Sequence, residues 1–554
     1  MSELLQELLN KRGITTEKDV EYFLNPSYEE HVHDPFLMKD MDKAVGRILK
    51  AIEKKEKIIF FTDYDCDGIP AGVIFHDFFK KIGYDNFENY IPHRHDEGFG
   101  LNLEAVEEFA KGGAKLLITA DCGITDVEDV ALANKLGIDV IITDHHLPGE
   151  KLPDAFAILD PKQDGCKYPE KMLCGSGVVY KLIQAILQKN RFGISDGWEK
   201  WLLDMVGMAT LSDMVPLLGE NRVFASYGLK VLRKSPRPGF QKLLRLAKAD
   251  QRNLVEDDIG FTVAPRINAA SRMGVPFDAF RLLSTQDEVE AGIIADHLNK
   301  INDERKGLVA SMVKEIKKRI DAREVIMSRK VLVMGNPNWR PAILGLAANT
   351  LMREHGRPVF LWGREGGEVI KGSCRSGDVN LVSIMQAAAP DTFIDFGGHG
   401  MSGGFSVSHE RIHLLEDELE RAYEKAVTLS GFEKGTQSQG YDVDKELLID
   451  DVNWRTYETV NKLAPFGEGN RKPIFSFKNA YIKEAKRFGK EGGHLELTFE
   501  NSQGKKIKAI KFFADDSPNL ERAKTGSTIT LLANLEKSVF RNFPELRLRV
   551  VDII

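Results

Sequence analysis

The sequence has few cysteines and no pattern that would pair them. There are five among its 554 residues, namely Cys66, Cys122, Cys166, Cys174 and Cys374, and no Cys-x-x-Cys occurs. An odd number at scattered spacings indicates neither a disulfide framework nor a structural zinc site. We therefore expect reduced thiols in a reducing compartment.

Long apolar runs are also missing. No stretch approaches the ~20 residues needed to span a bilayer. Residues 1–13, MSELLQELLNKRG, are amphipathic and lack the apolar core of a secretory signal. Hydrophobic residues make up 42% of the chain and charged residues 29%, which is ordinary for a globular protein. These absences predict a cytoplasmic protein without membrane association, and the length predicts several domains.

The sequence also lacks an overall excess of positive charge. The formal net charge of −7 argues against nucleic-acid binding by the whole surface. Residues 471–554, however, carry 17 Lys+Arg against 10 Asp+Glu. This asymmetry suits a polyanion-binding module inside an acidic enzyme, although a solvated basic face would give the same count.

Short apolar runs alternate with helical stretches from Lys57 onward. Alternation of this kind is typical of βαβ units, so we expect an α/β fold with a mainly parallel sheet. The predicted strands are 57–61, 115–120, 139–143 and 155–159, and the predicted helices between them are 69–82 and 126–136.

The rest of the chain shows three further patterns. Apolar residues recur at helical spacing over 284–324, and the helix-start signal there is Ser284 with Asp287 and Glu288. A second α/β stretch follows, and after the polar linker 433–440 only short strands remain, which predicts a small β-barrel or sandwich. The second α/β stretch has expected strands at 330–335 and 358–363 and an expected helix at 341–355.

Acidic residues follow each strand of the first predicted sheet. The strand 57–61 leads into DYDCDG (63–68), the next into Asp121, and the third into Asp144-His145-His146. Ligand sites in open α/β sheets lie beyond the carboxyl ends of the strands, so these side chains should meet in one crevice. Clustered like charges need neutralising cations, and carboxylates with imidazole suit Mn²⁺ or Mg²⁺. A pair of such ions is the usual equipment for phosphodiester hydrolysis.

Each of these motifs also has a simpler interpretation. A single Asp after a strand is usually a turn former or helix cap, and a His pair is usually ordinary polar packing. DxDxDG also begins calcium loops, but the position for the bidentate Glu falls at Phe75 or a neighbour in a helical run. The coincidence of three acid clusters at regular strand-end spacing favours the metal site.

These residues resemble the DHH phosphoesterase family, which is named after the triplet at 144–146. DYDCDG, ADCG (120–123) and LSDMVPL (211–217) resemble its other motifs. Segments along nearly the whole chain resemble the RecJ exonucleases of this family. Among these segments are IPHRHDEGFGL (91–101), PRINAASRMG (265–274), KGSCRS (371–376), GGHGMSGG (397–404) and LAPFGEGN (463–470).

The resemblance implies a specific domain order. A parallel-sheet DHH domain is joined by a long helix to a smaller α/β DHH-associated domain, and a β-barrel OB-fold follows. The expected parts are an N-terminal helical extension (1–45), the DHH catalytic domain (46–283), the connecting helix (284–328), the DHH-associated domain (329–432) and the OB-fold nucleic-acid-binding domain (433–554).

The resemblance also implies functional residues. Two metal ions would be held by Asp65, Asp67, Asp121, His145 and Asp213. Asp63 and His146 would assist as auxiliary ligands, and His146 could instead act on the phosphate or as a general acid. His399 would contact a phosphate that approaches the backbone of Gly397, Gly398 and Gly400, although GGHG could also be a plain flexible turn.

A terminal phosphate anchor would fix the direction of degradation. The candidates by motif are Arg94, Arg266, Arg272, Ser373 and Arg375, with Asn268 ordering the same loop. Any single arginine among them could instead be a solvated or salt-bridged surface residue.

The OB-fold implied at the carboxyl end would bind single strands through a basic groove and stacked aromatic rings. Aromatic residues in short strands are more often part of the core. The charge would come from Lys483, Lys486, Arg487, Lys505, Lys506, Lys508 and Lys511, and the rings from Phe488, Phe512 and Phe540.

Three positions depart from the common family pattern. Phe61 stands where many members have a histidine, and its strand context predicts a core residue. Arg340 stands where histidine is common, so no role is carried over to it. Cys374 replaces a common glycine, which we interpret as a packing change.

The sequence thus predicts a single-stranded-DNA-specific 5′→3′ exonuclease in DNA repair and recombination. It would be a monomer that uses Mn²⁺ or Mg²⁺ and releases 5′-mononucleotides, with a single-strand DNA-binding protein and a helicase as partners. Two alternatives stay open. One is a DHH enzyme for small substrates, such as a nano-RNA or cyclic-dinucleotide phosphodiesterase or a pyrophosphatase. The other is an inactive DNA-binding scaffold.

Overall fold

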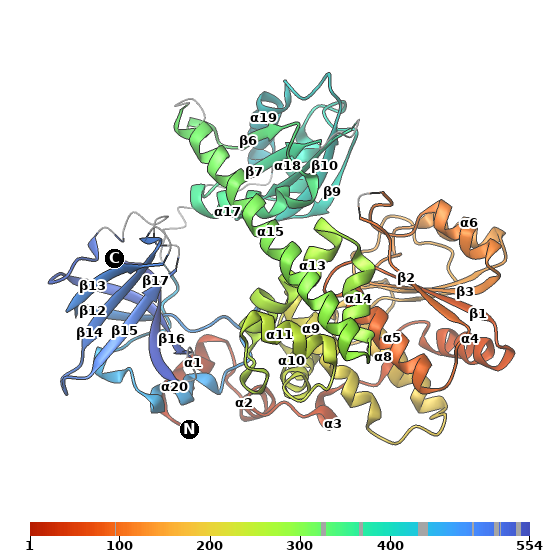
Figure 1. Ribbon diagram of the computed structural model, residues 1–554, viewed down its shortest axis with the longest axis horizontal. Helices are drawn as coiled ribbons and strands as arrows, with labels where there is room; N and C mark the ends of the chain where they lie inside the picture. The colour runs from red at the N-terminus through yellow and green to blue at the C-terminus, as the bar shows by residue number, and fades with distance from the viewer. Residues whose placement is uncertain are drawn as a thin grey trace. The chain divides into compact units, whose positions relative to one another are not determined.

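The protein is described from a computed structural model. It divides into two compact units, of which the first comprises Met1–Asn268, Pro276–Asp296 and Tyr441–Ile554 and the second Ala269–Val275 and His297–Gly440 (Figure 1). The predicted linker 433–440 and Phe540 lie outside the described residues. The structure describes all residues except 95, 323–327, 365–368, 430–440, 490–491, 513, 515–519, 521 and 539–543, and the side chains of His399 and Leu429.

A five-stranded sheet forms the centre of the first unit. All its neighbouring strands are parallel, as the alternating pattern predicted. Strands buried on both faces read as continuous apolar runs, which is why β1 and β3 were visible in the sequence. The strand order is β2 (Phe87–Tyr90), β1 (Lys57–Thr62), β3 (Ala114–Ala120), β4 (Asp139–Thr143) and β5 (Ala157–Leu159).

Helices cover both faces of this sheet. On one face, Phe60 of β1 stacks on Phe75 with ring centroids 4.4 Å apart. On the other face, the helices pack on an apolar cluster that includes Phe61, which is fully buried as predicted. The first face carries α4 (Met41–Lys54), α5 (Gly68–Lys81) and α8 (Gly175–Lys189), and the second α6 (Leu103–Lys111) and α7 (Val127–Lys135) (Figure 1).

A helical segment follows the sheet in the chain. The predicted long helix is α15, which begins at Glu288 after Asp287 accepts two backbone N–H groups. The expected start at Ser284 was wrong, because Ser284 ends the preceding helix. The segment contains α9 (Leu203–Ser212), α10 (Gly219–Leu232), α11 (Pro238–Ala247), α12 (Glu256–Asp258), a π-helical turn (Ile259–Val263), α13 (Ala264–Met273), α14 (Pro276–Ser284) and α15 (Glu288–Asp321).

The amino-terminal helices share a core with the carboxyl-terminal strands. Leu8 and Leu9 of α1 are fully buried in one apolar cluster with Phe475 and Leu531. The two ends of the chain therefore fold together within the first unit. The helices that enter this cluster are α1 (Glu3–Lys11) and α2 (Glu17–Leu24) near the amino end and α20 (Trp454–Asn461) before the strands, whereas α3 (Tyr28–His31) packs on α10.

The carboxyl-terminal strands form a mostly antiparallel sheet in which two pairs, β15 with β17 and β11 with β12, are parallel. Short strands are present here as predicted, and β13 was missed because its residues are mostly exposed. The order is β11 (Lys445–Glu446), β12 (Phe475–Tyr481), β16 (Thr528–Ser538), β17 (Glu545–Ile553), β15 (Lys506–Lys511), β14 (His494–Glu500) and β13 (Glu484–Phe488).

The second unit has a mixed five-stranded sheet. The strands and the helix that the sequence predicted correspond to β6, β7 and α17. Cys374 is fully buried, in keeping with a packing change. The strand order is β6 (Leu332–Asn336), β7 (Val359–Gly363), β8 (Ile370–Arg375), β10 (Ser402–Val407) and β9 (Asp395–His399), and the helices are α17 (Pro341–His355), α18 (Leu381–Ala387) and α19 (Leu415–Leu429).

No helix among the described residues is long and apolar enough to cross a bilayer. The domain boundaries expected from the sequence stay a prediction.

Candidate metal centre

The acidic residues predicted from the strand ends converge at the carboxyl edge of the parallel sheet. Asp63 follows β1, and its backbone N–H donates to the carbonyl of Ala120 at the end of β3. Asp121 follows β3, and its N–H donates in the same way to Thr143 at the end of β4. Adjacent strand ends thus bring these two carboxylates into one buried layer.

Asp67 is held by the start of a helix. Its carboxylate accepts the backbone N–H groups of Gly175 at 2.6 Å and Ser176 at 2.7 Å, where α8 begins. A helix amino terminus favours negative charge, so α8 supports a carboxylate that is only 1% exposed. Asp65 in turn accepts the N–H of Asp67 at 2.7 Å, which orders the loop between β1 and α5.

Glycine makes this close approach possible. A Cβ atom at Gly175 would lie 2.6 Å from the Cβ of Asp121, and one at Gly68 would lie 2.3 Å from the carbonyl oxygen of Asp63. Asp121 itself adopts a left-handed backbone conformation, with φ of 63°. Strain of this kind in a residue other than glycine is typical of functional sites.

His145 points into the acid cluster. Its Nε2 atom lies 3.1 Å from Asp121 and 3.8 Å from both Asp67 and Asp213. Burial, reinforced by the charge of His146, lowers the pKa of His145 to about 3. The ring is therefore neutral near pH 7, which is the form that binds metals.

Asp144 has a structural part in the triplet. Its carboxylate accepts N–H groups from Ile124, His145 and His146, and the Nδ1 atom of His146 lies 2.8 Å away. Burial alone would raise the pKa of Asp144, but the hydrogen bond and charge of His146 hold it below its ordinary value. Burial would lower the pKa of His146, but the same contact raises it to about 9.

The remaining carboxylates carry mutually repelling charges. Burial and the neighbouring acids raise the pKa of Asp67 to about 6. The same two causes raise the pKa values of Asp63, Asp121 and Asp213 well above the ordinary range. The cluster is therefore unfavourable as a set of bare carboxylates.

Ligand atoms gather in three overlapping groups, within each of which all atoms lie within 4.8 Å of one another. Two groups share Asp121 and two share His145, so two ions could sit side by side with ligands in common. The groups are Asp63 with Asp65 and Asp121, Asp67 with His145 and Asp213, and Asp121 with His145 and His146.

The residues present fit divalent ions. Oδ1 of Asp63 is buried with no hydrogen-bond partner among the described residues. A bound cation would satisfy this atom and offset the repulsion between the carboxylates. Oxygen ligands with one or two imidazoles and no thiolate suit Mn²⁺ or Mg²⁺ better than zinc.

Two of the predicted phosphate-binding residues of the first unit, Arg94 and Asn268, border this centre. The guanidinium of Arg94 lies 4.9 Å from the ring centroid of Tyr64, between Asp63 and Asp65 in sequence, and its charge lowers the pKa of Asp63 against the effect of burial. Asn268 accepts the N–H of Cys66 at 2.8 Å and so orders the loop between β1 and α5. Arg266 is nearly buried and donates to the carbonyl of Thr262.

In the second unit, Ser373 and Arg375 lie two residues apart on β8 and share its more exposed face. On the neighbouring strand β10, Gly404 pairs with Ser373 and Ser402 pairs with Arg375. On the next strand, β9, Gly404 pairs with Gly397 and Ser402 with His399, so these residues form two rows across the sheet. Gly397 and Gly398 thus belong to a strand, and the alternative of a flexible turn was wrong for them. The side chain of His399 lies outside what the structure describes.

Two other predicted positions in this unit have structural contacts. Arg272 donates to the carbonyl of Ala342 at 2.8 Å, in the first turn of α17. Arg340 is the residue that precedes the same helix. These contacts make Arg272 a support for α17 as well as a phosphate candidate.

Sequence reasoning missed Asp160 and Lys162, which follow β5. Asp160 is fully buried, Oδ2 has no partner among the described residues, and burial raises its pKa to about 7. The Lys162 ammonium donates to the carbonyl of His145. The strand-end rule could have found both, since they directly follow the fourth predicted strand.

The two predicted stacking rings that are described lie together on the carboxyl-terminal sheet. Phe488 and Phe512 each meet His494, at centroid distances of 5.2 and 5.1 Å, and Arg549 lies over Phe512 at 4.2 Å. These rings are half-buried, so they form a mixed aromatic and cationic surface and are not core residues.

A parallel sheet whose strand ends gather carboxylates and imidazoles defines a metal-dependent phosphoesterase of the DHH class. Family models match in the expected order. They are the DHH family N-terminal domain over residues 57–210, the DHHA1 domain over 328–426 and the RecJ OB domain over 443–552.

Comparison with individual proteins shows to which family within the DHH class the chain belongs. The chain is 33% identical over 99% of its length to the single-stranded-DNA-specific exonuclease RecJ of Bacillus subtilis, and covers 67% of that protein. The chain belongs to the RecJ family. A RecJ structure from Thermus thermophilus in complex with Mn²⁺ has a TM-score of 0.80 at 23% identity, covering 100% of this chain and 76% of that one. An exonuclease RecJ structure bound to manganese has a TM-score of 0.61 at 29% identity, covering 70% and 95%.

Proposed function

We propose that this chain hydrolyses single-stranded DNA from the 5′ end and releases 5′-mononucleotides, as part of DNA repair and recombination. The observation that carries the proposal is the set of overlapping ligand groups that share Asp121 and His145. Family membership supports the substrate, because the related proteins are named as single-stranded-DNA-specific exonucleases.

Each part of the metal centre has a proposed task. Asp63, Asp65, Asp67, Asp121, His145 and Asp213 would hold two ions, Mn²⁺ or Mg²⁺. When bound, such ions supply an activated water and stabilise charge on the scissile phosphate. His146, whose pKa is raised to about 9 by Asp144 against the effect of burial, keeps its proton near neutral pH. It is thereby equipped to protonate the leaving oxygen.

Polarity would come from capture of the terminal phosphate. In the first unit, Arg94 and Arg266 supply guanidinium groups, and Asn268 orders the loop that carries the acids. In the second unit, Ser373 and Arg375 would bind a phosphate that approaches the bare backbone of Gly397 and Gly398, with Arg272 as a further support. His399 stays a predicted phosphate contact.

The experiment is digestion of a 5′-phosphorylated oligonucleotide with a label at the 3′ end, in Mn²⁺ or in EDTA. Wild type should shorten the strand from the 5′ end only with metal. Asp121→Asn should lose at least about 10²-fold in rate, because several kcal/mol of charge stabilisation would be lost. The matched control is Asp154→Asn, at an exposed aspartate in the same sheet domain.

Other outcomes would favour the alternatives. An intact long strand beside a cleaved dinucleotide would favour an enzyme for small substrates. Binding without cleavage of either would indicate a scaffold. The expected single-strand DNA-binding protein and helicase partners, the monomeric state and the cytoplasmic location stay predictions.

A further inference from the structure

Asp213 differs from the other proposed ligands in how the fold places it. Most of those ligands follow strands of the parallel sheet, but Asp213 is the residue at which α9 ends. The next residue, Met214, has a left-handed backbone with φ of 58°. The backbone N–H of Asp213 donates to the carbonyl of Ala209 on α9 at 2.9 Å, and the segment Met214–Leu218 holds the chain on the other side of Asp213.

That segment is held by the loop Leu463–Asn470, which carries the LAPFGEGN sequence. The backbone N–H of Leu217 donates to the carbonyl of Glu468 at 2.8 Å. A Cβ atom at Gly467 would lie 2.8 Å from Cδ1 of Leu217, and one at Gly469 would lie 3.3 Å from Cβ of Pro216. The two backbones thus lie against each other four residues beyond the metal centre.

A single buried arginine holds this loop in place. Arg222, on the first turns of α10, is 2% exposed. Its Nη2 atom donates to the carbonyls of Leu463 and Ala464 at 3.0 and 2.9 Å, and its Nη1 atom to that of Pro465 at 3.3 Å. Its Nε atom donates to Phe23 on α2 at 2.7 Å. Only the planar fork of arginine can serve so many acceptors at once.

The loop also holds its own shape. Asn470 is 1% exposed, and its side-chain amide donates to the carbonyls of Leu463 and Pro465, both at 2.8 Å. Arg12 donates to the amide oxygen of Asn470 at 3.0 Å. All these polar groups have partners, so the loop is a defined element despite its glycines.

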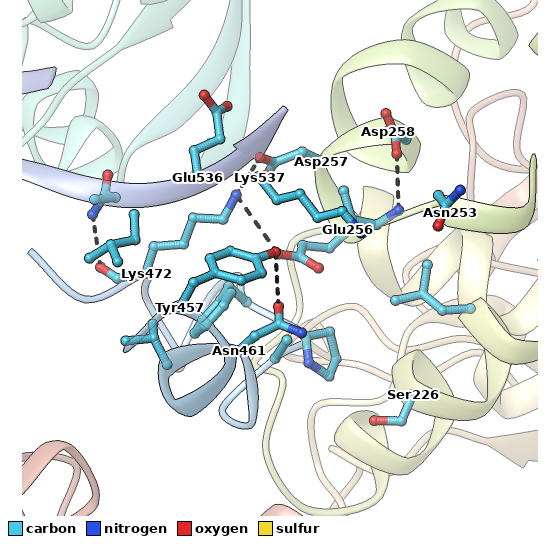
Figure 2. A pocket seen from close by; sticks show the side chains of 18 of the residues that line it. Ser226, Asn253, Glu256, Asp257, Asp258, Tyr457, Asn461, Lys472, Glu536 and Lys537 are labelled. Atoms are coloured by element: carbon cyan, nitrogen blue, oxygen red, sulfur yellow. Dashed lines mark hydrogen bonds and ion pairs between the residues drawn. The ribbon is translucent and has the colours of Figure 1, made fainter. Parts of the chain in front are cut away.

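A cavity of about 890 Å³ lies beside this loop, and Ala464, Pro465 and Phe466 line it. Figure 2 shows this cavity between the helical segment that bears Glu256 and Asp257 and the region of α20 and β16 that bears Tyr457 and Glu536. Lys472 reaches across it to Asp257. Beside this cavity, the loop Leu463–Asn470 is the tie that reaches the segment after Asp213, through the hydrogen bond from Leu217 to Glu468.

We propose that Arg222 and the loop Leu463–Asn470 position Asp213, so that the ion held by Asp213 with Asp67 and His145 binds tightly only when the carboxyl-terminal domain is docked. This inference rests on the proposed metal centre. It makes Arg222 a positioning residue that acts through the Leu217 segment. It also gives the LAPFGEGN sequence a task in metal binding besides joining domains.

The test is an electron paramagnetic resonance titration of the metal-free full chain with Mn²⁺. Wild type should bind two ions. Arg222→Lys should weaken one of them roughly 10-fold or more, since groups that orient metal ligands typically contribute 10–100-fold to affinity. The matched control is Arg47→Lys, at another buried arginine, which pairs with Glu56 and Asp139 at the amino end of β4.

A second variant covers the case in which Arg222→Lys does not fold. Gly467→Ala pushes on Leu217 and should weaken the same ion, and adding Leu217→Val, which removes the clashing Cδ1 atom, should restore it. Variants that bind both ions like wild type, even with a lowered melting temperature in EDTA, would overturn the inference. Failure of wild type to bind two ions would instead refute the metal centre, and this inference with it.

Discussion

Single glycines at the candidate sites of the two α/β sheets differ in the space around them. At the parallel sheet of the first unit, Gly68 and Gly175 let charged groups crowd together, since added Cβ atoms would lie under 3 Å from Asp63 and Asp121. On the β8–β10–β9 surface of the second unit, a Cβ atom at Gly397 would meet nothing within 4 Å. At the first site the glycines allow the backbone to approach the carboxylates closely, and at the second Gly397 leaves room beside the strand.

This difference matches the charge of the expected occupants. Crowded, buried carboxylates repel one another and so attract cations. A bare strand backbone beside Ser373 and Arg375 can admit a bulky anion and bind it with N–H and guanidinium groups. The comparison therefore predicts that a methyl group added at Gly175 damages the first site severely, whereas one added at Gly397 damages the second only slightly.

The largest effect is expected from Gly175→Ala. The new Cβ would clash with both the Cβ and the Cα of Asp121, and a backbone atom cannot move aside easily. We expect roughly 100-fold weaker Mn²⁺ binding, at the upper end of what misplaced ligands lose. The control is Gly177→Ala on the same helix, where the nearest atoms are at an ordinary 3.5 Å. Equal Mn²⁺ affinities of the two variants would contradict the comparison.

A smaller effect is expected from pH. Asp67 has a pKa of about 6, and Asp63, Asp121 and Asp213 are also raised, so the folded metal-free protein binds more protons than the unfolded chain. The contribution of these carboxyl groups to the free energy of unfolding is therefore fully present below about pH 4, the pKa of an aspartate in the unfolded chain. This contribution falls as pH rises through the pKa values of the groups in the folded protein.

Metal binding should show the reverse trend, because the ligands must lose protons. Below the folded pKa, affinity for Mn²⁺ should rise about tenfold per pH unit for each proton displaced. Thermal melting at pH 5, 6 and 7, with Mn²⁺ or with EDTA, checks both trends. A metal-free melting temperature that rises with pH in wild type but not in Asp121→Asn would show that the cluster is not strained.

The next effect concerns the second sheet. Arg375→Lys keeps the charge but loses the two-pronged contact with a phosphate. We expect the preference for 5′-phosphorylated over 5′-hydroxyl strands to fall about tenfold, or about 1.4 kcal/mol. The control is Arg421→Lys on α19, whose arginine pairs with Glu418. An unchanged preference would remove Arg375 from the phosphate site.

The sequence predicted four of the five strands of the first sheet, all but β2, and the acids that follow them, because both follow from local rules. Buried parallel strands are continuous apolar runs, and the residues after them must meet at one edge, so Asp63, Asp121 and His145 could be placed before the fold was known. Asp160 follows the same rule and was overlooked.

The supports of the site could not be predicted in this way. The hydrogen bonds from α8 to Asp67 join residues 108 positions apart, and Arg222 meets the carbonyl of Leu463 across 241 positions. No periodicity or spacing connects such pairs. The strands β9 and β13 were missed for a different reason, since glycine or exposed polar residues replace the apolar pattern there.

The smallest effect is expected from Gly397→Ala, and the neighbouring glycine gives its matched control. A methyl group at Gly397 has free space, so stability should change by less than about 0.5 kcal/mol. Gly398 has φ of 136°, and its Cβ would lie 2.4 Å from the carbonyl of Ser402, so Gly398→Ala should lower the melting temperature clearly. If the open surface receives the terminal phosphate, Gly397→Ala should raise KM for a 5′-phosphorylated strand about threefold, or about 0.6 kcal/mol, at unchanged kcat. An unchanged KM in a stable variant would mean that the terminal phosphate does not bind in the space beside Gly397. Free space beside a strand would then be no indication of a phosphate site.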